Sequence, residues 1–330
     1  MSNKVFSMTS VLVLSAGIAV ADVPKVAVDI APVHSLVSKI MNGLGSPSLI
    51  IPPEASPHEY QLRPSEAKAL QDANLVFWIG EDLSPWLKKG IATLATDALV
   101  TTLLEVDGIK LLEFREGVLF EAHDHDDHDD HDDHDDHDDH DDHDDHDDHE
   151  GHDDHEGHDH GEHDPHAWLS PEIAKIWLNI IATKLSEVDP DNAETYFSNA
   201  NSAKRELDLL SDEVNKLLDP VRDKKFIVFH DAYQYFERHF NITSSGAISL
   251  SDASDPSPAR LVEIRKRVVD QSIHCVLSEP QFNIGLVRSV VQGTDVNTGV
   301  MYPLGSNLEL GLSFYEKLIR NMAVSLKNCL

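Results

Sequence analysis

The feature that most constrains the fold of this chain is a tract that cannot contribute to a core. From Asp126 to His149 the triplet Asp-Asp-His repeats eight times without interruption. The wider stretch from Glu121 to Asp164 holds 25 acidic residues and no lysine or arginine. A segment with so little apolar content and so much like charge cannot bury enough surface to offset the entropy of ordering it. The sequence therefore predicts a disordered His/Asp-rich insert at 117–164 within a larger folded protein.

The tract also accounts for most of the formal net charge of −33. Outside it the 330-residue chain carries 34 acidic residues against 26 basic ones, so the folded part is only mildly acidic. No basic stripe is present that would attract a phosphate backbone. We therefore expect no nucleic-acid partner.

On both sides of the insert, short apolar runs alternate with segments of helical periodicity. Before it, the strand-like runs "KVAVDI", "SLIIP" and "NLVFWIG" enclose the helical segments "VHSLVSKIM" and "RPSEAKALQDA". After it, the strand-like runs are "KKFIVF", "GAISL", "CVLSEP" and "TGVMY", each followed by a helical segment. This alternation is typical of parallel sheets covered by helices. The predicted fold is α/β with two lobes, each a mostly parallel sheet flanked by helices.

A long amphipathic helix is predicted between the two sets of strands. Apolar residues recur every three or four positions from Ala193 to Leu217, which predicts one rigid helix of nearly 30 residues, roughly 40 Å long. Such a helix can run across two lobes and hold them at a fixed separation. The predicted organisation is a signal peptide at 1–21, an N-terminal lobe at 22–189 that includes the insert, a linking helix at 190–219 and a C-terminal lobe at 220–330.

The N-terminus is typical of an export signal. Lys4 supplies positive charge, the run from Val11 to Val20 is apolar, and "AVA" at 19–21 fits a small-residue cleavage site. A short membrane anchor is the weaker alternative, because the apolar run is too short to span a bilayer. We expect cleavage after Ala21 and an exported mature protein that begins at Asp22.

The chain contains two cysteines, Cys275 and Cys329. In an exported protein a small even number of cysteines favours a disulfide. Two buried free thiols are the alternative that the sequence leaves open.

Histidine is the residue type that points to function. Fifteen of the 21 histidines lie between His123 and His163, each near carboxylates. Neutral imidazole is a strong ligand for zinc and related metals, so the tract can wrap an ion in many near-equivalent ways. Its affinity should be modest, because every arrangement requires ordering of the backbone. The alternative is a solvated acidic spacer without ligand function.

Of the six other histidines, three lie at the ends of predicted elements. His58 follows the strand "SLIIP", His166 precedes a helix, and His230 follows the strand "KKFIVF". Strand carboxyl ends are where α/β folds place ligands. Because a single histidine is more often structural, residue types alone do not establish a three-histidine site. Structural roles are expected for the histidines that lie within helical patterns or at a helix-to-strand junction, namely His34, His239 and His274.

Several longer motifs carry a family resemblance. The segments "ASPHEYQLRPSEAKALQDANLVFWIG", "DPHAWLSPEIA", "FIVFHDAYQYFE", "EPQF" and "PLGSN" resemble, in this order, the zinc-uptake periplasmic binding proteins of bacterial ABC importers, the ZnuA type. The resemblance runs from about Val26 to the C-terminus, and an acidic His-rich insert before "DPHAWLSP" is also a family feature. It implies a periplasmic, monomeric, non-enzymatic protein that captures zinc with high affinity and delivers it to the membrane permease of an ABC transporter.

The resemblance also implies the site residues. His58, His166 and His230 match the family's three zinc-binding histidines, which would meet in the cleft between the lobes. Cys275 and Cys329 match the family's disulfide in the C-terminal lobe.

The fourth zinc ligand stays open. Some relatives carry an acid where this chain has Pro57, and others supply an aspartate where it has Tyr302. Water, a side chain of the insert, or a nearby acid such as Glu59 or Glu279 can fill the position. Three imidazoles and one exchangeable position suit zinc, whereas a carboxylate-rich site would suit manganese. Asp231, next to His230, is expected either to form a hydrogen bond that supports a ligand histidine or to cap the next helix.

Two other functions fit parts of the pattern. Three histidines and an open position also describe a catalytic zinc site, but the sequence contains no HExxH and no GxSxG motif. A zinc hydrolase is therefore the weaker hypothesis. A periplasmic zinc buffer or metallochaperone, with the insert as the working part, is the other alternative.

Overall fold

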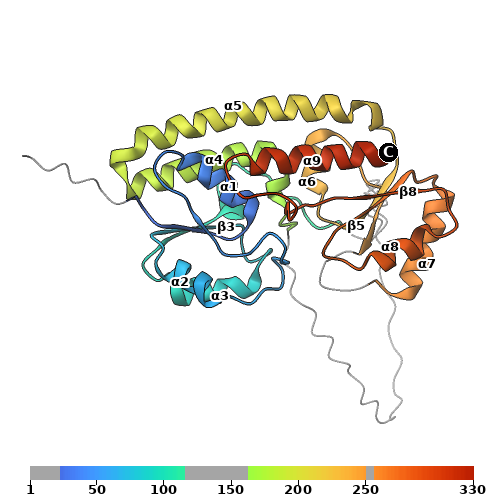
Figure 1. The fold of residues 1–330 in the computed structure, drawn as a ribbon, viewed down its shortest axis with the longest axis horizontal. Helices are drawn as coiled ribbons and strands as arrows, with labels where there is room; N and C mark the ends of the chain where they lie inside the picture. Colours follow the sequence, from blue (N-terminus) through green and yellow to red (C-terminus); the bar gives the residue numbers. More distant parts are fainter. Residues whose placement is uncertain (1–22, 116–162, 250–255) are drawn as a thin grey trace, which may run out of the picture.

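The computed structural model describes residues 23–115, 163–249 and 256–330 (Figure 1). The predicted signal peptide and nearly all of the predicted His/Asp-rich insert lie outside these residues. The described chain forms two lobes that lie side by side, with long helices running along one edge of both. Within the described ranges no helix is both long enough and apolar enough to cross a membrane.

The N-terminal lobe contains a four-stranded parallel sheet in the order β2-β1-β3-β4. β1 and β3 are buried along their whole length, which explains why their sequences are uninterrupted apolar runs. The elements of this lobe are β1 (Val26–Val28), α1 (Ala31–Ile40), β2 (Ser48–Leu49), α2 (Pro64–Gln71), β3 (Leu75–Trp78), α3 (Pro85–Leu94), β4 (Leu99–Thr102) and η1 (Leu103–Glu105).

The C-terminal lobe repeats this arrangement with a second parallel sheet in the order β6-β5-β7-β8. In each sheet the order in which successive strands are added reverses at the pair β1/β3 or β5/β7. Ligands of α/β proteins bind at the carboxyl ends of strands at such switch points. The elements are β5 (Phe226–His230), α6 (Gln234–Phe240), β6 (Ala247–Ser249), α7 (Pro258–Asp270), β7 (Cys275–Ser278), α8 (Ile284–Val291) and β8 (Asn297–Val300).

Three helices form the edge along the two lobes. They are α4 (Pro171–Val188), α5 (Ala193–Leu218) and α9 (Phe314–Cys329), with the short turns η2 (Ala167–Leu169), η3 (Pro190–Asn192) and η4 (Asp219–Val221) around them. The 26 residues of α5 make it about 39 Å long, which confirms the predicted long helix. In Figure 1 α5 runs above both lobes, with α4 and α9 beneath it.

One apolar core continues through both lobes. It joins β1 and β3 to the inner faces of α4, α5 and α9 and extends to residues of the second sheet such as Phe226 and Leu277. A smaller cluster that includes Ile227, Ile264 and Val290 lies within the C-terminal lobe. The lobes therefore share packed side chains and are not joined by α5 alone.

Polar contacts fix α9 to the N-terminal lobe. Ser35 Oγ on α1 donates to Gly311 O at 2.9 Å and accepts from Tyr315 N at 3.1 Å. Lys39 on α1 pairs with Glu206 on α5 at 2.5 Å and with Glu316 on α9 at 2.6 Å. The last helix of the chain is in this way bound to the first.

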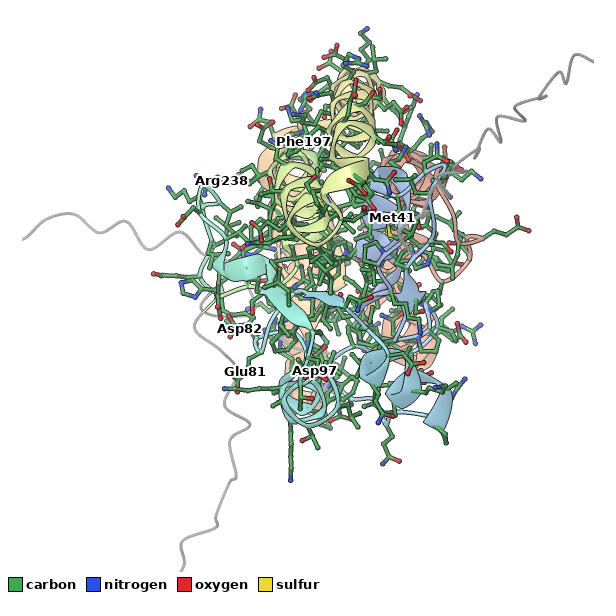
Figure 2. The ribbon with its side chains drawn as sticks, turned by 90° about the vertical axis from the view of Figure 1, so that its left-hand side faces the viewer. Met41, Glu81, Asp82, Asp97, Phe197 and Arg238 are labelled. Atoms are coloured by element: carbon green, nitrogen blue, oxygen red, sulfur yellow. A yellow bond between two sulfur atoms is a disulfide. The ribbon has the colours of Figure 1, made fainter. Side chains whose placement is uncertain are left out.

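Two elements of the N-terminal lobe were not anticipated from the sequence. The view along the lobes places α3 and its surroundings, marked by Glu81, Asp82 and Asp97, at the end opposite to α5, where Phe197 lies (Figure 2). Of the residues in α3, only Leu87 and Ile91 are buried, and β4 is an edge strand of mostly exposed residues. The segment of α3 still carries helical spacing, with Leu87, Ile91 and Leu94 four and three positions apart, whereas β4 lacks the apolar run of a buried strand.

The disulfide Cys275–Cys329 is confirmed and joins the start of β7 to the end of α9 across 54 positions. We expect the double variant C275A/C329A to lose about 4 kcal/mol of unfolding free energy, because the cross-link restricts the unfolded chain. Urea unfolding of oxidised protein measures the difference. Wild-type protein unfolded in reductant serves as the control and should lose a similar amount. An unchanged urea midpoint in both samples would contradict this role.

Candidate metal centre

The three histidines singled out from the sequence meet between the lobes. The ring centroid of His166 lies 5.7 Å from that of His58 and 5.4 Å from that of His230. His58 comes from the loop after β2, His166 precedes η2, and His230 is the last residue of β5. The fold thus brings together three segments that are far apart in the sequence.

The ring spacing is close to that of a metal-bound set. With Zn–N distances of about 2.0–2.1 Å, imidazoles on a tetrahedral ion have their centroids about 5 Å apart. Across residues 23–115, 163–249 and 256–330, no group of three or more His, Cys, Asp or Glu side chains is arranged to hold a metal ion as it stands. Coordination therefore requires the rings to reorient.

The loop that carries His58 is held by the start of α3. The carbonyl oxygen of Pro57 accepts hydrogen bonds from Ser84 Oγ and from Trp86 Nε1, both at 2.8 Å. Ser84 is fully buried. The backbone N–H of His58 donates to Ser56 Oγ at 3.3 Å. Sequence reasoning missed this support because α3 was not anticipated.

His166 is oriented by a carboxylate two residues before it. Asp164 Oδ1 lies 2.7 Å from His166 Nδ1 and accepts from the backbone N–H of His166 at 3.0 Å. The other face of the ring lies near Trp168, at a centroid distance of 5.2 Å. The contact with Asp164 engages Nδ1, so His166 would bind a metal through Nε2.

His230 is oriented in the same manner by a residue from the neighbouring strand. Glu279, directly after β7, places Oε1 2.6 Å from His230 Nδ1 and accepts from Gln281 Nε2 on Oε2 at 3.1 Å. Phe282 lies edge-on to the ring of His230 at 5.4 Å. The pair thus forms at the switch point between β5 and β7, and Nε2 of His230 is again the atom that would face a metal.

This arrangement changes two expectations. Glu279, which the sequence left open as a fourth ligand, lies behind His230, where a carboxylate fixes the tautomer and raises the basicity of a ligand imidazole. The prediction that Asp231 caps the next helix is wrong, because α6 begins after Tyr233. The Asp231 carboxylate instead accepts hydrogen bonds from Arg115, a residue that no local rule could identify.

Buried acids surround these histidines. Asp164, Asp231, Glu237 and Glu279 are all buried, and Arg115 is the cation that contacts two of them. Burial raises the pKa of the Asp164 carboxyl to about 7 and that of the Asp231 carboxyl to about 6. A bound cation would relieve the electrostatic cost of these carboxylates. The surroundings therefore favour a metal ion over an anionic or neutral ligand.

The histidines expected to be structural have partners elsewhere. His34 on α1 donates through Nε2 to Pro47 O at 3.2 Å, and His239 on α6 lies 3.1 Å from Ser211 Oγ. His274 is exposed just before β7. His34 and His239 therefore have packing roles, and His274 is a surface residue.

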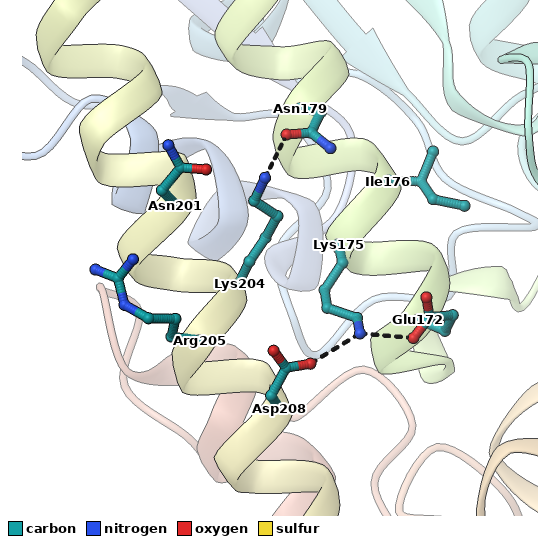
Figure 3. Close-up of a pocket in the computed structure, with 8 residues that line it drawn as sticks. All are labelled: Glu172, Lys175, Ile176, Asn179, Asn201, Lys204, Arg205 and Asp208. Atoms are coloured by element: carbon teal, nitrogen blue, oxygen red, sulfur yellow. Dashed lines mark hydrogen bonds and ion pairs between the residues drawn. The ribbon is translucent and has the colours of Figure 1, made fainter.

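A polar hollow on the outer surface between α4 and α5 has a different character (Figure 3). Lys175 pairs there with Glu172 at 2.7 Å and with Asp208 at 2.8 Å, and Lys204 donates to Asn179 at 2.8 Å. Its lining residues contain no imidazole or thiolate, and its two acids both pair with Lys175. We interpret it as a solvent-exposed groove between α4 and α5.

Comparison with known proteins gives a consistent result. The family model described as "Zinc-uptake complex component A periplasmic" matches residues 26–329. The high-affinity zinc uptake system protein ZnuA of Brucella abortus is 49% identical over 305 residues, which cover 92% of this chain and 91% of the relative. The protein of the same name from Paracoccus denitrificans is 43% identical over 311 residues, covering 94% and 93%.

Solved structures show the same fold. One described as "Crystal structure of ZnuA" has a TM-score of 0.71 at 22% identity and covers 93% of this chain and 99% of its own. A ZnuA deletion mutant with zinc bound has a TM-score of 0.70 at 22% identity, covering 93% and 98%. At this identity the likeness concerns the fold alone.

We expect the carboxylates behind the imidazoles to control metal affinity. The variants Asp164→Asn and Glu279→Gln should each weaken zinc binding about 10- to 100-fold, because an amide is a poorer partner for Nδ1–H of a ligand histidine. Competition with a chromophoric chelator measures the affinity. Asp189→Asn is the matched control, since Asp189 is buried but bonds Tyr196 and Asn192. Equal affinities in all three variants would contradict the assignment.

Proposed function

Because the chain belongs to the ZnuA family of periplasmic zinc-uptake components, we propose that it captures zinc through His58, His166 and His230 and delivers it to the membrane permease of an ABC-type importer. The observation that carries this proposal is the meeting of three imidazoles between the lobes, two of them backed by buried carboxylates. The proposed ligand set is three neutral nitrogens, which zinc prefers.

The fourth coordination position belongs to an exchangeable ligand such as water in this proposal. Glu279 is engaged through both oxygens, by His230 and Gln281, so it serves to orient His230. A zinc site with one open position captures the ion tightly and still allows exchange.

The division of the ligands between lobes suits release. His58 and His166 lie in the N-terminal lobe and His230 in the C-terminal lobe. Because Zn–N bonds are only about 2.0–2.1 Å long, a relative shift on the order of 1 Å at the cleft breaks coordination. A permease that separates the strand end of β5 from the other two loops would therefore free the ion.

The remaining parts of the proposal follow from the family and the sequence. The protein is exported by its predicted signal peptide with cleavage after Ala21, acts as a monomer, has no catalytic activity and has no nucleic-acid partner. The insert, which lies outside the described residues except at its C-terminal end, has an accessory role. A preformed cleft is ordered during folding, whereas a flexible tract must be ordered at each binding event. Tethering still raises the local zinc concentration near the cleft.

We expect single alanine variants of His58, His166 and His230 each to weaken the tight zinc site by about 100-fold. A structural zinc site holds about 10–16 kcal/mol over four ligands, which corresponds to roughly two orders of magnitude for each ligand. Chelator competition at fixed pH measures this loss. His34→Ala is the matched control and should bind zinc like the wild type. If His166→Ala retains the wild-type affinity, the ligand assignment is wrong.

Deletion of residues 123–163 separates the roles of the cleft and the tract. We expect the deletion variant to lose weak, multiple zinc sites and to keep one tight site, because the three cleft histidines remain. Calorimetric titration of both proteins with zinc gives the stoichiometry and the affinity of each class. Loss of the high-affinity event in the deletion variant would favour the zinc-buffer alternative.

A further inference from the structure

Arg115 joins the two lobes next to the candidate metal centre. Its Nε donates to Asp231 Oδ1 at 3.0 Å and to Oδ2 at 2.9 Å, its Nη2 also pairs with Asp231, and its Nη1 donates to Glu237 Oε2 at 2.8 Å. Arg115 belongs to the segment that follows β4 and η1, whereas both acids belong to the β5–α6 region. The guanidinium therefore crosses from one lobe to the other.

The segment that carries Arg115 is paired with the segment that carries His166. Asp164 N donates to Leu112 O at 2.8 Å, and Glu113 forms an antiparallel bridge with His163. We refer to residues 112–115 and 163–164, which this single bridge and hydrogen bond join, as the ribbon. The ribbon ends two residues before His166.

Helix α6 of the C-terminal lobe forms hydrogen bonds with this ribbon. Tyr235 OH accepts from Leu112 N and donates to Asp164 O, both at 3.0 Å. Gln234 Nε2 donates to Glu113 O and to Asp164 Oδ2, both at 3.1 Å. These bonds join the ribbon to the helix that follows His230.

The contacts form a closed circuit between the segments that carry two of the histidines. It runs from Asp164 through the ribbon to Arg115, across the ion pair to Asp231, along the backbone to Gln234 and back to Asp164. Asp164 bonds His166, and His230 directly precedes Asp231. A closed circuit of short bonds restrains the spacing of its members more than an open chain does. The Arg115 contacts therefore complete the restraint on the distance between the rings of His166 and His230.

The burial and charge of Arg115, Asp231 and Glu237 favour a rigid contact between the lobes. The side chains of Asp231 and Glu237 are 3% and 5% exposed, and that of Arg115 is 17% exposed. Removing one partner of a buried ion pair leaves an uncompensated charge, which the structure relieves by moving or admitting water. The planar guanidinium contacts both carboxylates in fixed directions, which a lysine ammonium cannot reproduce.

We propose that Arg115 is a positioning residue for the cargo metal: its ion pairs with Asp231 and Glu237 fix the spacing of His166 and His230 and so slow the release of zinc. This inference rests on the proposed function. It assigns no ligand role to Arg115, which acts through the β5–α6 loop and the ribbon.

The variant Arg115→Gln tests the proposal in the full-length mature protein. We expect zinc to dissociate about 10- to 100-fold faster, the range seen when groups supporting metal ligands are removed, with little change in the association rate. Stopped-flow mixing with a chelator in excess measures the dissociation rate. Co²⁺ loaded into the tight site should also show altered visible absorption, because the ligand geometry is relaxed.

Arg222→Gln is the matched control. Arg222 has a similarly shielded side chain, 23% exposed, and bonds the carbonyl oxygens of Phe240 and Asn241 at the far end of α6. We expect this variant to lower the thermal midpoint without changing zinc dissociation or the Co²⁺ spectrum. Equal acceleration of zinc release in both variants would mean a purely structural role for Arg115 and would overturn the proposal.

Arg115→Lys keeps the test decisive if Arg115→Gln does not fold. Lysine retains the positive charge but lacks the planar guanidinium that contacts two carboxylates at once. We therefore expect zinc release to be about 10-fold faster than in the wild type. Wild-type release rates in Arg115→Lys and in any folded Arg115→Gln protein would overturn the inference while leaving the proposed function intact. Absence of a tight zinc site in the wild type would instead overturn the proposed function, and this inference with it.

Discussion

The packing of both lobes against a shared set of helices is the constraint on which the candidate metal centre depends. Rings from separate lobes keep a spacing of 5.4 Å, as His166 and His230 do, only if the lobes keep a fixed relation. The continuous core under α5 and α9 supplies it. Because protein interiors are close-packed and compress little, a large relative movement would open voids in this core. In the proposed site, metal affinity therefore depends on packing far from the three histidines, and release relies on small shifts at the loops.

Two of the histidines are oriented by carboxylates, one of which is close in the sequence and the other distant. Asp164 lies two residues before His166, so the backbone of a single turn sets the pair. Glu279 reaches His230 from the adjacent strand, so the register of β5 and β7 sets that pair. The same chemical arrangement thus depends once on local and once on tertiary structure. A defect in the second sheet would disturb His230 before it disturbed His166.

The sequence was sufficient for those features that local patterns encode. Apolar runs and helical periodicity predicted both sheets and the long helix α5. At the start of α4 the backbone N–H of Ile173 donates to Ser170 Oγ, as in an ordinary helix cap. The resemblance singled out three histidines that the fold does bring together. Neither source showed what supports them. The pairing of Arg115 with Asp231 spans 116 positions, and β4 is too exposed to leave a clear apolar pattern.

The buried carboxylates influence which metal ion the proposed site selects. Hard cations such as Mg²⁺ and Ca²⁺ need oxygen ligands, yet the nearby carboxylates are engaged by nitrogen donors: Asp164 by His166 and Gln234, Glu279 by His230 and Gln281, and Asp231 by Arg115. Their negative charge still favours a cation, while the donor atoms of the proposed site are imidazole nitrogens. Imidazole donors suit zinc better than manganese, calcium or magnesium. The acids thus contribute the field and the histidines the selectivity, and exchanging these roles would require breaking the hydrogen bonds that hold the rings in place.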